Sequence, residues 1–172
     1  MAEMTVTSEP HELPDRKKLA RLQRVLDQRR PDLTPFVDLY KDLHQHPELS
    51  CFESRTASVV AACLRRMNLE VRTSVGGHGV VGLLKNGHGK TILLRAELDA
   101  LPIEEKTGLP YASKARMKDV VGVERPVMHA CGYDIHIACV FASLKLLQSA
   151  SKEWSGTIIA VFQPNEETPG GA

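Results

Sequence analysis

The stretch that decides the fold covers residues 135–162 and reads IHIACVFASLKLLQSASKEWSGTIIAVF. Apolar side chains recur at helical spacing in its first half, which predicts a helix over residues 135–149 with one buried face. Residues 157–162 form a continuous apolar run between Gly156 and Pro164, and this pattern predicts a buried strand. A helix that leads directly into a buried strand is typical of an α/β layer fold.

The same alternation of helix and strand continues toward the N-terminus. Strands separated by glycine-rich turns are predicted over residues 69–74, 80–84 and 91–96. Further helices are predicted over residues 15–30, from Thr34 to the proline at position 47, and over residues 56–67. Thr34 is expected to cap its helix, and Ser50 with Glu53 is expected to form a capping box. Residues 104–127 are charged and irregular.

The composition of the 172-residue chain is that of an ordinary globular protein, with 42% hydrophobic and 25% charged residues. Its net charge of +1 favours neither a nucleic-acid nor a membrane partner for the chain as a whole. The N-terminus lacks the apolar core of a signal peptide, and the longest apolar stretch, residues 135–144, is too short to span a bilayer. We therefore expect a cytoplasmic protein.

The four cysteines argue against two common small-protein classes. They stand at positions 51, 63, 131 and 139, so no CxxC pair exists. This spacing disfavours a zinc ribbon and a disulfide-dense secreted scaffold. Cys51 and Cys63 are expected in or near the apolar core, because they fall close to the buried face of a predicted helix.

The N-terminal region predicts two segments ahead of the main domain at 34–172. Residues 1–14 are polar and are expected to be disordered. Residues 15–33 hold a basic helix, with seven Lys and Arg residues between positions 16 and 30 and a stripe formed by Leu19, Leu22, Val25 and Leu26. Such a helix can bind a membrane or a nucleic acid, but a solvated helix that packs its stripe on the body of the protein is the favoured interpretation.

Two short motifs resemble nucleotide-binding loops and are rejected. Residues 77–82 read GHGVVG, which matches G-x-G-x-x-G, yet an apolar β-rich run follows where the phosphate site requires a helix N-terminus. Residues 89–91 read GKT, the end of a P-loop, but Leu84 stands where the first glycine should be and a strand follows. Both are expected to be turns.

Three segments beside predicted strand ends carry residues suited to chemistry. They are residues 95–102 (RAELDALP), 128–136 (MHACGYDIH) and 162–167 (FQPNEE). The middle segment places a thiol, two imidazoles and a carboxylate within eight residues, and these groups are ligands for zinc or a harder divalent ion. In the glutamate pair, one carboxylate could bind a metal while the other accepts a proton from water as a general base. A surface Glu-Glu turn beside a buried cysteine is the structural alternative.

Together these segments resemble the amidohydrolase branch of the zinc metallopeptidase family M20, which includes aminoacylases, hippurate hydrolases and indole-acetyl-amino-acid hydrolases. Residues 43–50 (LHQHPELS) resemble the family's N-terminal signature. The three segments above resemble its R-A-[DE]-x-D-A-L-P, M-H-A-C-G-H-D-x-H and F-Q-P-x-E-E motifs, and Gly170–Ala172 resembles the G-A that follows. The resemblance covers nearly everything after residue 34.

The resemblance implies the N-terminal part of a zinc-exopeptidase-like catalytic domain, with a mixed β-sheet flanked by helices. It implies hydrolysis of the amide bond in N-acyl amino acids or similar peptide-like conjugates with a divalent metal, Zn, Mn or Co. By position, Glu166 resembles the general base, while Cys131 and Glu167 resemble metal ligands. Supporting roles are implied for Asp99 and Asp134. The signature histidines His44, His46, His129 and His136 are expected to be structural or to support the metal ligands, and His129 and His136 are counted with the supporting residues of the site.

Two departures from the family pattern stand out. Tyr133 replaces a histidine, and a phenol with a pKa near 10 is a poor ligand at neutral pH, so one metal ligand is expected to be lost. The chain also ends at Ala172, before the family's later histidine ligands and its lid or dimerisation domain, through which members often form homodimers. A truncated, inactive remnant that binds no metal is therefore the alternative to a working amidohydrolase. A cysteine nucleophile, Cys131 activated by His129 or His136, is a further and weaker alternative.

Overall fold

The computed structural model describes residues 15–168 and divides the chain into two units, residues 1–30 and residues 31–172. In the first unit, helix α1 spans Arg16–Arg29, and the side chain of Asp15 caps it by accepting a hydrogen bond from the backbone N–H of Lys17 at 3.3 Å. None of the α1 residues is buried within this unit, and the favoured interpretation, a stripe packed on the body of the protein, stays a prediction. The predicted disorder of residues 1–14 lies outside the described residues.

The second unit alternates helices and strands along the chain, as the sequence predicts. Its helices are α2 (Thr34–Gln45), α3 (Ser54–Arg66), α4 (Tyr133–Ser149) and the short 3-10 turn η1 (Ser151–Glu153). Its strands are β1 (Glu70–Val75), β2 (Gly79–Asn86), β3 (Thr91–Glu97), β4 (Arg116–Lys118), β5 (Glu124–Pro126) and β6 (Gly156–Gln163). No described helix is both long enough and apolar enough to cross a membrane.

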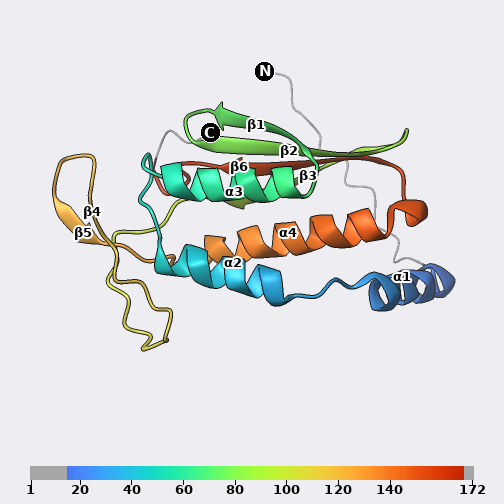
Figure 1. Cartoon of the computed structure of the whole chain (residues 1–172), viewed down its shortest axis with the longest axis horizontal. Coiled ribbons are helices and arrows are strands. Elements are labelled where there is room, and N and C mark those ends of the chain that lie inside the picture. Colours follow the sequence, from blue (N-terminus) through green and yellow to red (C-terminus); the bar gives the residue numbers. More distant parts are fainter. Residues whose placement is uncertain (1–14, 169–172) are drawn as a thin grey trace, which may run out of the picture. The chain divides into compact units, whose positions relative to one another are not determined.

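The four long strands form a mixed sheet in the order β1-β2-β6-β3 (Figure 1). Strand β6 is antiparallel to β2 and parallel to β3. The chain returns from β3 to its parallel partner β6 through α4, because parallel neighbours need a crossover connection. The mixed sheet flanked by helices is confirmed, and the residue 157–162 run forms a central strand.

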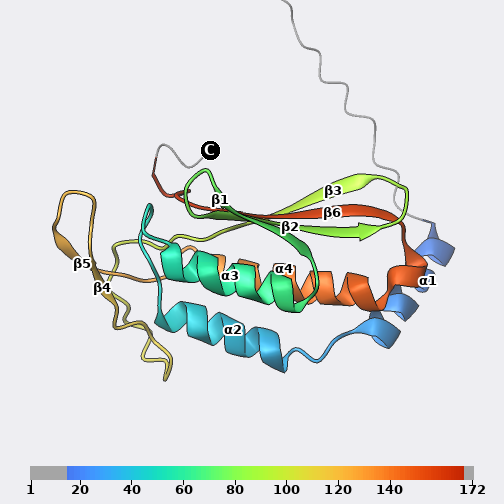
Figure 2. The same ribbon diagram turned by 45° about the horizontal axis from the view of Figure 1, so that its top comes forward.

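The core lies between the sheet and the α3–α4 layer, and Figure 2 shows both helices against the same face of the sheet with α2 beneath them. Phe141 of α4 stacks on Phe162 of β6, with ring centroids 5.3 Å apart. Both rings are almost fully buried, as are Leu64 of α3 and Leu144 of α4. Gly82 of β2 lets α3 approach closely, since a Cβ there would lie 2.9 Å from the side chain of Leu64. Interdigitated apolar side chains of this kind are the main source of folding free energy.

Both rejected nucleotide motifs are turns. Residues 77–82 form the end of the β1–β2 turn and the start of β2, where Gly76 and Gly77 take positive φ angles of 60° and 103°. Residues 89–91 lead from β2 into β3. Neither segment precedes a helix, so neither offers the backbone N–H groups of a helix N-terminus to a phosphate.

Four local expectations are wrong, and each has a physical reason. The α2 N-cap is Leu33, because Asp32 accepts the hydrogen bond from the backbone N–H of Thr34. The capping box is absent at α3, since the Ser50 hydroxyl donates to Asp99 and the Glu53 carboxylate accepts from the backbone N–H of Asn165. Cys51 is exposed because it lies in the turn before α3, at a φ of 70°. The stretch 104–127 contains the small hairpin β4–β5.

Candidate active site

The candidate site lies at the edge of the sheet where the parallel strands β3 and β6 end together. Glu97 and Gln163 are register partners at these two ends, and the backbone N–H of Leu98 donates to the carbonyl of Gln163 at 2.8 Å. Asp99 follows β3, and the paired glutamates follow β6. The carboxyl ends of parallel strands are where α/β folds place their ligands. The topology therefore brings two of the three chemistry-bearing segments together.

Asp99 is a buried anchor between the loops of this edge. Its side chain is fully buried, and its Oδ2 atom accepts hydrogen bonds from the Ser50 hydroxyl at 2.7 Å and the backbone N–H of Glu167 at 2.9 Å. Its other oxygen, Oδ1, is buried without a hydrogen-bond partner. Asp99 thus fixes the backbone that carries Glu167 and keeps one oxygen available.

Cys131 is exposed, contrary to the alternative of a buried cysteine, and its thiol lies beside the Glu167 carboxylate. A hydrogen bond to the Glu167 carboxylate, together with burial, raises the pKa of the Cys131 thiol to about 11. The Oε1 atom of Glu167 is buried and has no hydrogen-bond partner. A protonated thiol is a poor nucleophile, so this environment disfavours the cysteine-nucleophile alternative. A cation bound between the two groups would instead favour the thiolate.

Tyr133, the first residue of α4, reaches the other glutamate of the pair. Its hydroxyl donates to Oε2 of Glu166 at 2.7 Å. Burial and this hydrogen bond to a carboxylate raise the pKa of the phenol, so Tyr133 stays protonated. The residue that replaces the family histidine therefore contacts the carboxylate that resembles the general base.

The two histidines of the 128–136 segment differ in environment. His129 is 4% exposed, and neither ring nitrogen has a hydrogen-bond partner. Burial lowers its pKa, so the ring is neutral and both its nitrogens are unsatisfied. His136 is exposed, with Nδ1 at 3.9 Å from a Glu97 oxygen. In the described part of the chain, neither histidine forms a hydrogen bond with Cys131.

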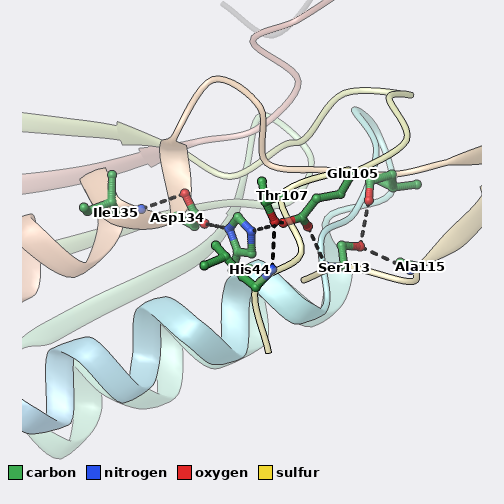
Figure 3. A network of polar contacts seen from close by, with 9 residues as sticks. His44, Glu105, Thr107, Ser113, Ala115, Asp134 and Ile135 are labelled. Atoms are coloured by element: carbon green, nitrogen blue, oxygen red, sulfur yellow. Dashed lines mark hydrogen bonds and ion pairs between the residues drawn. The ribbon is translucent and has the colours of Figure 1, made fainter. Parts of the chain in front are cut away.

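A buried charge cluster holds the start of α4 against α2 (Figure 3). His44 of α2 lies between two carboxylates, with Nδ1 at 2.6 Å from Asp134 Oδ2 and Nε2 at 3.0 Å from Glu105 Oε1. The three side chains are at most 7% exposed. Burial opposes protonation of the ring, but the two hydrogen bonds to carboxylates prevail and raise the pKa of His44. The imidazolium form donates from both nitrogens and satisfies both acids.

Glu105 ties the same cluster to the loop that follows β3. It accepts hydrogen bonds from the Thr107 hydroxyl and the backbone N–H of Ser113 (Figure 3). Asp134 in turn accepts from the backbone N–H of Ile135 at 2.9 Å. The cluster joins α2, the 105–113 loop and the first turn of α4, the turn that carries Tyr133. The supporting position implied for Asp134 lies in this cluster, whereas the sequence offers no local signal for Glu105.

Glu53 also organises the site, and the capping-box role expected for it is wrong. It is fully buried, and its Oε1 atom accepts from the backbone N–H groups of Asn165 at 2.7 Å and Cys51 at 3.0 Å. Burial raises the pKa of this carboxyl group. Glu53 therefore fixes the backbone immediately before the glutamate pair from a position more than one hundred residues earlier.

The donor chemistry at this edge fits a divalent cation. A thiol and two buried carboxylate oxygens without partners, on Asp99 and Glu167, are unfavourable unless a cation or water satisfies them. Over residues 15–168, however, no three His, Cys, Asp or Glu side chains are placed to hold one metal ion. A catalytic zinc commonly takes three protein ligands, so Cys131 and Glu167 would need a third.

Thiolates and carboxylates are ligand types that zinc accepts, and the carboxyl edge of an α/β sheet is where such folds place their ligands. Residues 93–172 match the model of peptidase family M20/M25/M40. The chain is 39% identical over 137 residues to the N-acetyl-L-cysteine deacetylase of Bacillus subtilis, and 42% identical over 138 residues to the hippurate hydrolase of Campylobacter jejuni. These alignments cover 79% and 80% of this chain, and 31% and 33% of the two relatives.

Solved structures agree with the sequence matches. A putative aminohydrolase from Staphylococcus aureus superposes with a TM-score of 0.75 and 35% identity over 87% of this chain and 38% of its own. The Bacillus subtilis YXEP protein, described as a dinuclear metal binding peptidase, has a TM-score of 0.69 and 36% identity over 78% of this chain and 36% of its own. The chain is therefore similar to members of peptidase family M20, and it spans about a third of the length of the relatives it matches.

Proposed function

We propose that this chain carries part of the active site of a metal-dependent amidohydrolase that cleaves the amide bond of N-acyl amino acids or similar conjugates. The observation that carries the proposal is the convergence of Cys131, Glu167, Glu166 and Asp99 at one sheet edge, with carboxylate oxygens left unpartnered there. The relatives that the chain matches include a deacetylase and a hippurate hydrolase, which act on small amides by name.

In this proposal each residue has a distinct part. Cys131 and Glu167 would hold a divalent cation, with zinc, manganese or cobalt as the candidates. Such a cation polarises a carbonyl and makes water more acidic. Glu166 accepts the proton of the attacking water and delivers it to the leaving nitrogen, as a general base and then acid. Asp99 holds the backbone of Glu167 in place through its 2.9 Å hydrogen bond.

Hydrolysis of a panel of N-acyl amino acids by the metal-supplemented chain tests the proposal. Glu166→Gln removes the proton acceptor with little change of shape and is expected to lower kcat by at least about a hundredfold. Glu104→Gln is the matched control, because Glu104 is an exposed glutamate whose side chain is 68% accessible. Turnover that survives Glu166→Gln, or equal losses in both variants, would exclude Glu166 as the base.

The Tyr133 hydrogen bond supports a second candidate function, a site that binds N-acyl amino acids without hydrolysing them. A phenol that donates to Glu166 at 2.7 Å competes with water for the carboxylate that the hydrolase needs. Tyr133→His would restore the imidazole of the family pattern, and Tyr133→Phe would remove the competing hydroxyl. If wild type is inactive while the histidine variant hydrolyses the panel, the non-catalytic candidate is correct for this chain.

A further inference from the structure

Helix α1 concentrates positive charge that the rest of the chain does not share. Residues 15–30 contain seven basic and two acidic side chains, residues 31–172 contain fifteen basic and sixteen acidic ones, and residues 1–14 contain three acidic ones and no Lys or Arg. One of the two acids, Asp27, accepts a hydrogen bond from Gln23 at 2.9 Å, and the other, Asp15, caps the helix. The near-neutral net charge of the whole protein therefore conceals a strongly cationic segment with a net charge of +5.

The same helix presents an apolar stripe that is not buried. Leu19, Leu22 and Leu26 follow one another at spacings of three and four residues, which places them on one face of the helix. Their exposed fractions are 49%, 49% and 45%. Lys17, Arg21 and Arg24 fall on the opposite face by the same geometry. Leucines this accessible are unfavourable in water unless a partner covers them.

We propose that α1 is a peripheral membrane-binding helix that lies on anionic phospholipid surfaces. An interfacial helix combines an apolar face with a polar face rich in Lys and Arg and has low overall hydrophobicity. The leucines would enter the boundary of the acyl chains while the basic side chains meet lipid phosphates and carboxylates. Helix α1 belongs to the first unit and the candidate active site to the second, and the inference does not depend on the proposed hydrolase activity.

Two other partners fit these observations less well. A nucleic acid would be attracted by the charge, but its phosphate backbone gives the three exposed leucines nothing to bury against. A second copy of α1 could cover the leucines, but two helices of net charge +5 would repel each other. An anionic bilayer is the partner that satisfies the charge and the apolar stripe together.

Co-sedimentation of the full chain with vesicles tests this inference. Binding is expected to phosphatidylcholine–phosphatidylserine vesicles and to be far weaker with phosphatidylcholine alone, and it should decline with added salt. Each basic residue near an anionic surface contributes about fivefold in affinity. Lys18→Glu combined with Arg24→Glu should therefore weaken binding by at least about tenfold, and Leu22→Asp should weaken it comparably. The matched control, Lys145→Glu with Lys152→Glu, reverses two exposed lysines of the second unit and should bind as wild type does.

Three results would overturn the inference. One is the absence of any difference between anionic and neutral vesicles. The second is binding to double-stranded DNA that exceeds vesicle binding and is unaffected by Leu22→Asp, which would assign the helix to nucleic acid. The third is a stable dimer in solution that Leu22→Asp dissociates, because the leucine stripe would then be a subunit interface.

Discussion

Replacing His44 with alanine should destabilise the second unit strongly, because it removes the cation between two buried acids. The Asp134 and Glu105 side chains are 1% and 0% exposed, and each lies within 3.0 Å of a His44 nitrogen. Breaking a buried ion pair by removing one partner costs about 3–5 kcal/mol, since the remaining charge is left uncompensated. We expect His44→Ala to lower the free energy of unfolding by an amount in that range, a large share of a domain's total stability.

Urea unfolding followed by the fluorescence of Trp154 measures this loss. His46→Ala is the matched control, because His46 lies two residues away with a side chain that is 51% exposed. Its ring contacts the backbone carbonyl of Asp42 at 2.7 Å near the helix end, and its removal should cost no more than about 1 kcal/mol. A His44→Ala loss below about 1 kcal/mol, or one equal to that of His46→Ala, would refute the reasoning.

The stability that His44 contributes should also depend on pH. The folded state raises the pKa of His44, so its contribution is complete below the unfolded value near 6.5 and disappears as the pH rises through the folded value. The pKa of Glu105 is lowered in the folded state, because its hydrogen bonds outweigh the opposing effect of burial. The contribution of Glu105 is therefore complete above about pH 4.3 and disappears as the pH falls through its folded value. The difference between wild type and His44→Ala should be greatest between these limits.

Three further substitutions test the packing of the sheet. Gly82→Ala would bring a Cβ within 2.9 Å of the Leu64 side chain and should cost about 1–3 kcal/mol, as measured by urea unfolding. Gly156→Ala should be worse, because the new Cβ would meet the Lys90 carbonyl at 2.3 Å, whereas Gly87→Ala has open space and serves as its control. Leu144→Ala should cost about 2–5 kcal/mol by leaving a core cavity, and a loss below about 1 kcal/mol would show that the α4 packing is misplaced.

The helices and strands could be predicted from the sequence because their signals are local. Apolar spacing at 135–149 and the run at 157–162 predict α4 and β6, and glycines 76 and 77 mark the hairpin between β1 and β2. The motif segments following β3 and β6 could also be expected at one sheet edge, since parallel strands end together. The metal-binding and proton-accepting roles expected for these segments follow from their residue types alone.

The polar contacts that organise the site could not be predicted, because they join residues far apart in the chain. His44 meets its partners 61 and 90 positions away, and Glu53 meets Asn165 at a separation of 112 residues. Ser50 and Glu53 carry the local pattern of a capping box, yet tertiary hydrogen bonds to Asp99 and the 165 backbone take precedence. Local sequence patterns therefore fail to predict the role of a side chain that makes tertiary hydrogen bonds at the site.

Cobalt binding tests the central claim, a divalent metal site that includes Cys131, most directly. Co²⁺ replaces zinc in many sites, and its bond to a thiolate produces a charge-transfer absorption band. The account predicts near-stoichiometric binding with this band in wild type, its loss in Cys131→Ser, and its retention in Cys139→Ser, since Cys139 is an exposed cysteine on α4. A folded wild-type protein without the band, or a band that survives Cys131→Ser, would contradict the account.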